Sequence, residues 1–307
     1  MWFNNALVYL YQFDKPLDDI PALEQDQLKP CPAHARFTYG WVSPFDQGLT
    51  HSIAGCTVIC LGKEERILPR NVVQRHVTEK VKALETERGF PVKRSERAQI
   101  AEDIEFDLLP KAFCLQKKLF ALFDTVHQRL IINTSSVNQA SQLLALLRKS
   151  IPGMHIEPLG CSENLTLRFN HWINHPNELP PHFELASDCL LTSMDDEKKR
   201  FSCKGGELAE IQSLLSQGFA ANEISLIWYE RIQFTLTQTL CLKRLKCLDY
   251  LQDDLNDIAN MDGEEHQRDA KITLLSGELR GLCNSIIAEL VDNQPLKTLP
   301  NDAVVSQ

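Results

Sequence analysis

The sequence predicts a mixed α and β protein of the α+β class, a multi-domain chain with antiparallel sheets and an inserted helical finger. The chain has 307 residues and is 43% hydrophobic, which suffices for a sizeable core divided between two or three domains. Short β-rich runs occur near the N-terminus and again later, and two segments of helical period lie between them. We therefore expect one sheet domain that is discontinuous in the sequence.

The first sixty residues have the pattern of strands joined by loops. The β-rich run at 7–11 reads LVYLY, and the apolar run at 57–61 reads TVICL, which suits a buried strand. Prolines and glycines break any long element between them, at Pro30, Pro32, Gly40, Pro44 and Gly48.

The finger consists of two helices. The first begins after Pro69 and ends before Gly89 and Pro91, with an apolar stripe of Val73, Val77, Val81 and Leu84. The second has Ser95 as its candidate N-cap and Pro110 as its stop, with a stripe of Ile100, Ile104 and Leu108.

The β pattern resumes after the finger, and helices close the chain. We expect strands at 119–125, 129–133, 156–159 and 164–169 and a helix at 137–149. The Pro-rich stretch 176–181 is expected to be a domain boundary or an exposed loop, followed by strands within 184–201, a helix at 208–217 and a long hairpin at 224–242. The C-terminal helices carry a leucine-rich stripe from Leu274 to Leu290, and a frayed tail follows Asn293. The predicted domains are a sheet domain (1–69 with 114–175), the finger (70–113) and a base domain (176–307).

Charge is distributed unevenly along the chain. The formal net charge is −9, yet residues 63–97 hold ten Lys or Arg against six Asp or Glu. The stretch from Asp249 onward contains twelve acidic and four basic residues, so its net charge is −8. A basic helical segment in such a chain can meet the phosphates of a nucleic acid, although helix faces rich in Lys and Glu are more often only solvated.

Neither a membrane span nor a secretory signal is predicted, because no long apolar run exists. The ten cysteines are scattered through apolar contexts and lack the CxxC spacing of zinc or redox sites, so we expect reduced, mostly buried thiols and a cytoplasmic location.

Four segments are weak candidates for chemistry. His171 and His175 have a spacing that places two imidazoles on one helix face, but packing explains them better than a metal. The run 204–206, Lys-Gly-Gly, opens a helix and could hold a phosphate, but a lone glycine pair is more often just a turn. The cysteine pairs 56/60 and 241/247 fit core thiols better than a metal or redox site. The acidic residues could supply the ligands of a metal-dependent nuclease, but nothing fixes their geometry; they are Asp253, Asp254, Asp257, Asp262, Glu264 and Glu265.

No nucleotide-binding loop, GxSxG elbow or dinucleotide fingerprint is present in the sequence. We therefore expect no catalytic residue, metal or cofactor.

Several separate blocks, in one order, resemble the recombination-associated protein RdgC family of proteobacteria over nearly the whole chain. They are 2–5 (WFNN), 40–44 (GWVSP), 63–69 (KEERILP), 108–113 (LLPKAF), 144–150 (LALLRKS), 231–234 (RIQF) and 242–246 (LKRLK). The resemblance implies a non-catalytic, ring-shaped homodimer that encircles double-stranded DNA with little sequence preference, restrains the recombinase RecA and associates with the nucleoid.

The resemblance also implies roles for particular residues. Phe113, with Leu109 and Pro110 before it, corresponds to the aromatic anchor of the finger (tip) domain, which closes one dimer contact. Lys93, Arg94 and the stretch from Arg200 to Lys204 correspond to positions along the DNA-facing surface. This chain departs from the family pattern at Cys203, where relatives carry a further lysine, and we expect weaker DNA binding as a result.

Together these considerations give a pool of residues for DNA contact, only some of which will face the DNA. The pool is Lys63, Arg66, Arg75, Lys80, Lys93, Arg94, Arg200, Lys204, Lys243 and Arg244. The main alternative is a protein-interaction module that regulates a recombinase without binding DNA directly, and the two differ in the salt dependence of binding.

Overall fold

The computed structural model describes residues 3–13, 15–17, 20–161, 163–196 and 198–291. Within these residues it holds seven α-helices and two antiparallel sheets. The strands are β1 (Leu7–Gln12), β2 (Phe37–Trp41), β3 (Thr50–Ile53), β4 (Cys56–Ile67), β5 (Phe113–Asp124), β6 (Arg129–Ile132), β7 (His155–Pro158), β8 (Phe183–Ser193), β9 (Arg200–Cys203), β10 (Phe219–Trp228), β11 (Ile232–Thr237) and β12 (Leu242–Cys247). The helices are α1 (Arg70–Arg88), α2 (Arg94–Leu108), α3 (Val137–Ser150), α4 (Leu165–Asn174), α5 (Leu208–Ser216), α6 (Asp249–Ala259) and α7 (Glu264–Leu290).

The first sheet has the strand order β2-β4-β5-β6-β1-β7, with β3 also paired to β4. Because successive side chains of a strand point to opposite faces, each central strand contributes side chains to two hydrophobic cores, one on each face of the sheet. Ile59 and Phe123 pack beneath α3, whereas Val58 and Leu122 pack into a core shared with α7 and the second sheet. All four side chains are at most 1% exposed, so α3 and α7 cover opposite faces of a fully buried sheet centre.

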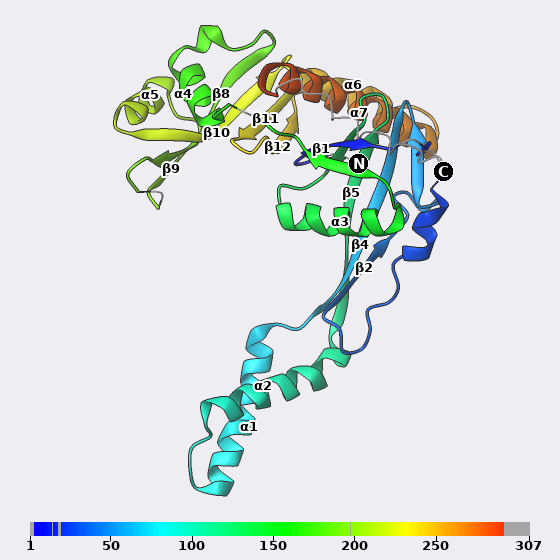
Figure 1. Ribbon diagram of the computed structural model, residues 1–307, viewed down its shortest axis with the longest axis vertical. Helices are drawn as coiled ribbons and strands as arrows, with labels where there is room; N and C mark the ends of the chain where they lie inside the picture. Colours follow the sequence, from blue (N-terminus) through cyan, green and yellow to red (C-terminus); the bar gives the residue numbers. More distant parts are fainter. Residues whose placement is uncertain (1–2, 14, 18–19, 162, 197, 292–307) are drawn as a thin grey trace, which may run out of the picture.

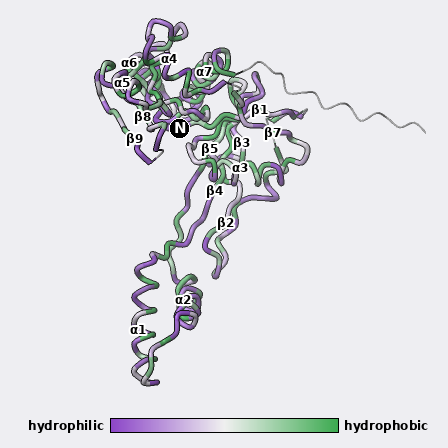
Figure 2. Tube along the Cα trace, turned by 60° about the vertical axis from the view of Figure 1, so that its left-hand side comes forward, coloured by the Kyte–Doolittle hydropathy of each residue, from purple (hydrophilic) through white to green (hydrophobic). Residues whose placement is uncertain are grey.

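The strands β4 and β5 are twelve residues long and pair along their whole length, from Cys56 opposite Asp124 to Ile67 opposite Phe113. Only the inner half lies in the sheet core, because side chains of β5 change from buried to exposed towards Phe113. The outer half is a ribbon that carries α1 and α2 away from the body, as both views show (Figures 1 and 2).

The helices α1 and α2 form a hairpin with a small core of its own, in which Val77, Val81 and Ile100 are buried. Gly89 ends α1 in the left-handed conformation (φ 77°), which a glycine adopts without strain. The prediction of Ser95 as an N-cap is wrong: Lys93 occupies that position and Ser95 lies inside the first turn of α2. The boundaries of the two helices otherwise match the expectation.

The second sheet has the order β12-β11-β10-β8-β9. The N-terminal segment joins the two sheets, because Ala6 and Leu242 exchange backbone hydrogen bonds of 2.7 and 2.9 Å. One hydrophobic core runs through both sheets, α4, α5 and α7. The structure thus links the sheets through a common interior, and the division of the chain into three domains stays a prediction.

The expected strand at 164–169 is wrong, since this segment begins helix α4. Leu165, Leu167 and Phe169 alternate like a strand, but Leu167 is 64% exposed while Leu165 and Phe169 are buried. The buried set continues to Trp172 and Ile173, which gives the helical spacing i, i+4, i+7, i+8. The side chain of Asn164 caps this helix by accepting a hydrogen bond from the Thr166 amide at 3.1 Å.

Two short strands, β2 and β3, lie in the stretch where prolines and glycines were expected to break any long element, and neither was assigned from the sequence. The predicted tail after Asn293 lies outside the described residues. Among the helices that the structure describes, none combines the length and apolarity needed to cross a bilayer.

Candidate nucleic-acid interface

The chain is bent, and α3 and the turn after β9 lie on the inner side of the bend, whereas α6 and α7 lie on its outer side (Figure 1). We call the inner face the surface that runs from the β9 turn (200–206), past the N-terminus of α3, to Lys63 and Lys117. Two polar pockets lie on this face, one on each side of the loop that begins α3.

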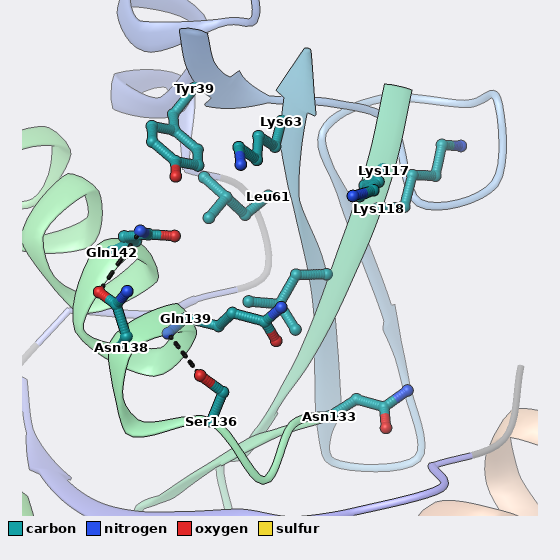
Figure 3. Close-up of a pocket in the computed structure, with 11 residues that line it drawn as sticks. Tyr39, Leu61, Lys63, Lys117, Lys118, Asn133, Ser136, Asn138, Gln139 and Gln142 are labelled. Atoms are coloured by element: carbon teal, nitrogen blue, oxygen red, sulfur yellow. Dashed lines mark hydrogen bonds between the residues drawn. The ribbon is translucent and has the colours of Figure 1, made fainter. Parts of the chain in front are cut away.

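The larger pocket, of about 600 Å³, lies between α3 and the ribbon of β2, β4 and β5 (Figure 3). Lysines line the ribbon side, and amide side chains of α3 line the other. The lining residues are Tyr39, Leu61, Lys63, Lys117, Lys118, Leu119, Asn133, Ser136, Asn138, Gln139 and Gln142.

Lys63 is held in place by its neighbours. Its Nζ lies 3.2 Å from Oε1 of Glu65 and 5.0 Å from the centroid of the Phe37 ring. Lys117 reaches the other oxygen of Glu65 at 3.1 Å. Hydrogen bonds from Lys117 and Lys63 hold the pKa of Glu65 below its usual value, so the carboxylate stays charged between two ammonium groups.

The smaller pocket, of about 220 Å³, is lined by Arg200 and Lys243 together with hydroxyl and amide side chains of the second sheet. Glu223 neutralises part of this charge, because its carboxylate lies 2.6 Å from Nζ of Lys243 and 3.5 Å from Nη2 of Arg244. A register shift between the pairs Gln233/Lys246 and Thr235/Lys243 interrupts the regular alternation of β12, and Arg244 within the shift has a φ of 55°.

The β9 turn differs in detail from the phosphate loop expected at 204–206. The amide of Gly205 donates a 3.0 Å hydrogen bond to Asp188, and helix α5 begins only at Leu208. Gly206 is required by close packing, because a Cβ there would lie 2.0 Å from Sγ of Cys203. What remains available to a ligand is the exposed Lys204 side chain, rather than the backbone amide of Gly205.

The remaining basic residues of the pool have different surroundings. Arg75 of α1 lies 3.9 Å from Glu79. Exposed side chains that form no ion pair among the described residues belong to Lys80, Lys93, Arg94, Arg200 and Lys204.

Arg66, by contrast, forms its hydrogen bonds with backbone groups of the same chain. Its guanidinium donates to the carbonyls of Cys31, Pro32, Leu109, Pro110 and Ala112 at 3.0 to 3.4 Å. These bonds fasten the base of the hairpin to the loop before β2.

The three residues expected at a dimer contact differ in exposure. Phe113 is 86% exposed, whereas Leu109 is 3% exposed and packs inside the chain. Exposed apolar side chains of Ile67 and Leu115 lie beside Phe113, because Ile67 is its partner across the ribbon. Pro110 is exposed as well, so Phe113 and Pro110 are the members of this group that offer a surface to another molecule.

The other chemical candidates have structural partners. His171 and His175 stack at 4.7 Å, and Nε2 of His171 lies 2.7 Å from Glu178. Asp254 accepts from Arg231 at 2.6 Å, which turns part of the acidic segment into an ion pair. Within the described residues, no group of three or more His, Cys, Asp or Glu could hold a metal ion.

All ten cysteines are free thiols, and seven of them are buried, as expected. Burial raises the pKa of Cys60 and of Cys283 to about 12, so these thiols are protonated and unreactive.

The sequence reasoning missed Lys117 and the amide side chains of α3. The consecutive lysines Lys117 and Lys118 interrupt an otherwise apolar strand, and this interruption was the available signal. The amide residues carry no such signal, because only the packing of α3 against the ribbon brings them to the lysines.

The family model described as "RdgC: Putative exonuclease, RdgC" matches residues 1–293. The chain is 32% identical to the recombination-associated protein RdgC of Pseudoalteromonas translucida over 300 residues, which cover 95% of this chain and 98% of that protein. It is also 32% identical to the proteins of the same name from Aeromonas hydrophila and Proteus mirabilis, over 94% of this chain and 98% of each relative. The chain belongs to the RdgC family, whose members in these organisms are named recombination-associated proteins.

Proposed function

We propose that this protein binds double-stranded DNA without sequence preference, through backbone phosphates, as a ring-shaped homodimer. The observation that carries the proposal is the separation of charge across the bend. Arg200 and Lys204 are exposed and belong to β9 and the turn after it. This part of the backbone lies on the inner side of the bend, while the acidic helices α6 and α7 lie on the outer side (Figure 1). Phosphate contacts of this kind bind any sequence, because they read no base edge.

The negative net charge does not oppose this function. Fields of exposed charges decay over about 8 to 10 Å at ordinary salt, so DNA at the inner face responds mainly to that face. Two copies that close around a duplex would place both inner faces towards it and the acidic helices towards solvent. The exposed Phe113 at the end of the ribbon supplies an apolar anchor for one contact between the copies.

A role in recombination follows from this binding mode. A ring on duplex DNA occupies the phosphates that a recombinase filament needs, and we propose that it restrains RecA through this occupancy, without catalysis. The name of the relatives, which refers to recombination, supports this proposal.

The test is binding to random-sequence linear duplex DNA, followed by fluorescence anisotropy between about 50 and 200 mM salt. Each phosphate contact contributes about 0.9 to the slope of log K against log salt. We expect a steep slope in the wild type and a slope lower by about 0.9 in Lys204→Ala. Lys271→Ala, which removes a lysine of helix α7 on the outer side of the bend (Figure 1), serves as the control and should leave the slope of the wild type unchanged.

Two results would overturn the proposal. Absence of binding at the lowest salt would favour the alternative, a protein-interaction module that acts on a recombinase without DNA. Shortening of the DNA on addition of magnesium or manganese would favour the exonuclease named in the family description. We expect the DNA to remain intact.

A further inference from the structure

The larger pocket of the inner face has the size and lining of a ligand site. Its volume of about 600 Å³ falls within the range of about 300 to 1,000 Å³ typical of small-molecule sites. Tyr39, Leu61 and Leu119 give it an apolar portion, while lysines and amides supply polar groups. A plain phosphate contact would need none of the apolar surface.

The basic side of the pocket is a row across three strands. Tyr39 of β2 pairs with Lys63 of β4, which pairs in turn with Lys117 of β5, so all three point to the same face. Like charges directly opposite each other destabilise a sheet. Here Glu65 bridges the two lysines. With Lys118, which also lines the pocket, the three lysines and Glu65 carry a net charge of +2, which favours an anion such as a phosphodiester.

The opposite wall consists of amide side chains at the start of α3. Gln142 donates to Oδ1 of Asn138 at 3.5 Å, and Gln139 accepts from Thr134 at 2.6 Å. The side-chain amide nitrogens of Asn138 and Gln139 form no hydrogen bond with other described residues. Amide groups both donate and accept, as the edge of a nucleobase requires.

We propose that this pocket binds one unpaired nucleotide of a DNA strand. Lys63 and Lys117 hold its phosphate, the base lies against Tyr39, Leu61 and Leu119, and the amides of α3 meet the edge of the base. A paired base cannot use the pocket, because its faces are stacked and its Watson–Crick edge is occupied. The proposal rests on the proposed DNA binding and adds a preference for DNA that contains an unpaired nucleotide.

The experiment compares three duplexes of one sequence by fluorescence anisotropy at constant salt. The first is continuous, the second carries a single-nucleotide bulge, and the third carries an abasic residue in the bulge. We expect the bulged duplex to bind at least about 5-fold more tightly than the other two, the lower end of what one stacked base contributes. The abasic duplex controls for flexibility, because it bends like the bulge but offers no base.

Two variants test the pocket itself. Lys117→Ala and Gln142→Ala should reduce the preference for the bulged duplex to less than about 2-fold. The matched control is Lys111→Ala, which removes a lysine near the base of the hairpin that lines none of the pocket. It should retain the preference of the wild type. Melting curves identify any variant whose fold is disturbed, and for such a variant Gln142→Leu or Lys117→Gln takes its place.

Failure of this inference differs from failure of the proposed function. If the wild type binds all three duplexes equally, the pocket holds no nucleotide while duplex binding stands. If Lys117→Ala weakens all three duplexes by one factor and keeps the preference, Lys117 is an ordinary phosphate contact and the pocket is again rejected. Absence of binding to every duplex would overturn the proposed function.

Discussion

Arg66 shows how the same side chain can suggest one role in the sequence and have another in the fold. In the sequence it belongs to a basic run, and a phosphate contact is a natural expectation. In the structure its guanidinium spans two segments, the loop at Cys31 and Pro32 and the turn from Leu109 to Ala112. Five donors in a planar fork suit this position, because a single arginine can then satisfy several carbonyls at once.

We expect Arg66→Ala to lower the free energy of unfolding by about 1.5 to 3 kcal/mol, the range for hydrogen bonds to a charged group. The variant Arg66→Lys should restore little of this loss, since an ammonium lacks the fork. Chemical denaturation measures the change. Arg75→Ala is the control, because Arg75 is 70% exposed and should change stability by less than about 0.5 kcal/mol. Equal stability of the two alanine variants would remove the structural role of Arg66.

At the scale of elements, the sequence predicted best those segments whose period extends over many residues. The helices α1, α2 and α3, the strand β6 and the inner half of β5 lie where the apolar spacing placed them, whereas β5 begins at Phe113, six residues before the expected strand. Segment 164–169 was misassigned because its six residues fit both periods, and only the burial of Trp172 and Ile173 decides between them. The strands β2 and β3 were missed because glycine and proline lie in and around them.

The candidate site was less predictable than the elements. Exposed lysines such as Lys204 were found because charge is visible in the sequence. The pocket was not, because it forms where α3 packs across a ribbon whose strands lie far from it in the sequence, as Lys63 and Gln139 illustrate. No local pattern encodes such an approach.

The α1–α2 hairpin should open more readily than the body, because its core is small. Val77→Ala removes two buried methyl groups, worth about 1.6 kcal/mol at about 0.8 kcal/mol each. We expect amides of α1 and α2 to exchange with solvent about 15-fold faster, while those of α3 keep the rate of the wild type. Hydrogen exchange measured by mass spectrometry distinguishes the two regions.

Val137→Ala is the control for the hairpin variant, since Val137 is 68% exposed and should change neither region. If Val77→Ala accelerated exchange in α3 equally, the hairpin and the body would unfold as one unit. The long β4–β5 ribbon would then transmit the loss of the hairpin core to the sheet.

At the scale of the whole molecule, the proposed ring has a consequence that surface binding lacks. A closed ring on circular DNA is retained topologically even when salt weakens every phosphate contact, whereas on linear DNA it slides off the ends. The proposed closure depends on Phe113, which is 86% exposed at the outer end of the ribbon. An apolar side chain of that size, left in water, gains free energy when a second copy covers it.

We therefore expect the wild type, loaded at low salt, to remain on a circular plasmid after a wash at high salt and to leave once the plasmid is cut. Phe113→Ala should bind at low salt but leave the circle in the wash, because the contact that closes the ring is weakened. Tyr250→Ala provides the matched control, since Tyr250 is also exposed (62%) but belongs to α6 on the outer side of the bend (Figure 1), and this variant should be retained. Retention of Phe113→Ala would show that Phe113 does not close the ring. Loss of the wild type itself in the wash would mean that the chain binds DNA from one side, as an open surface.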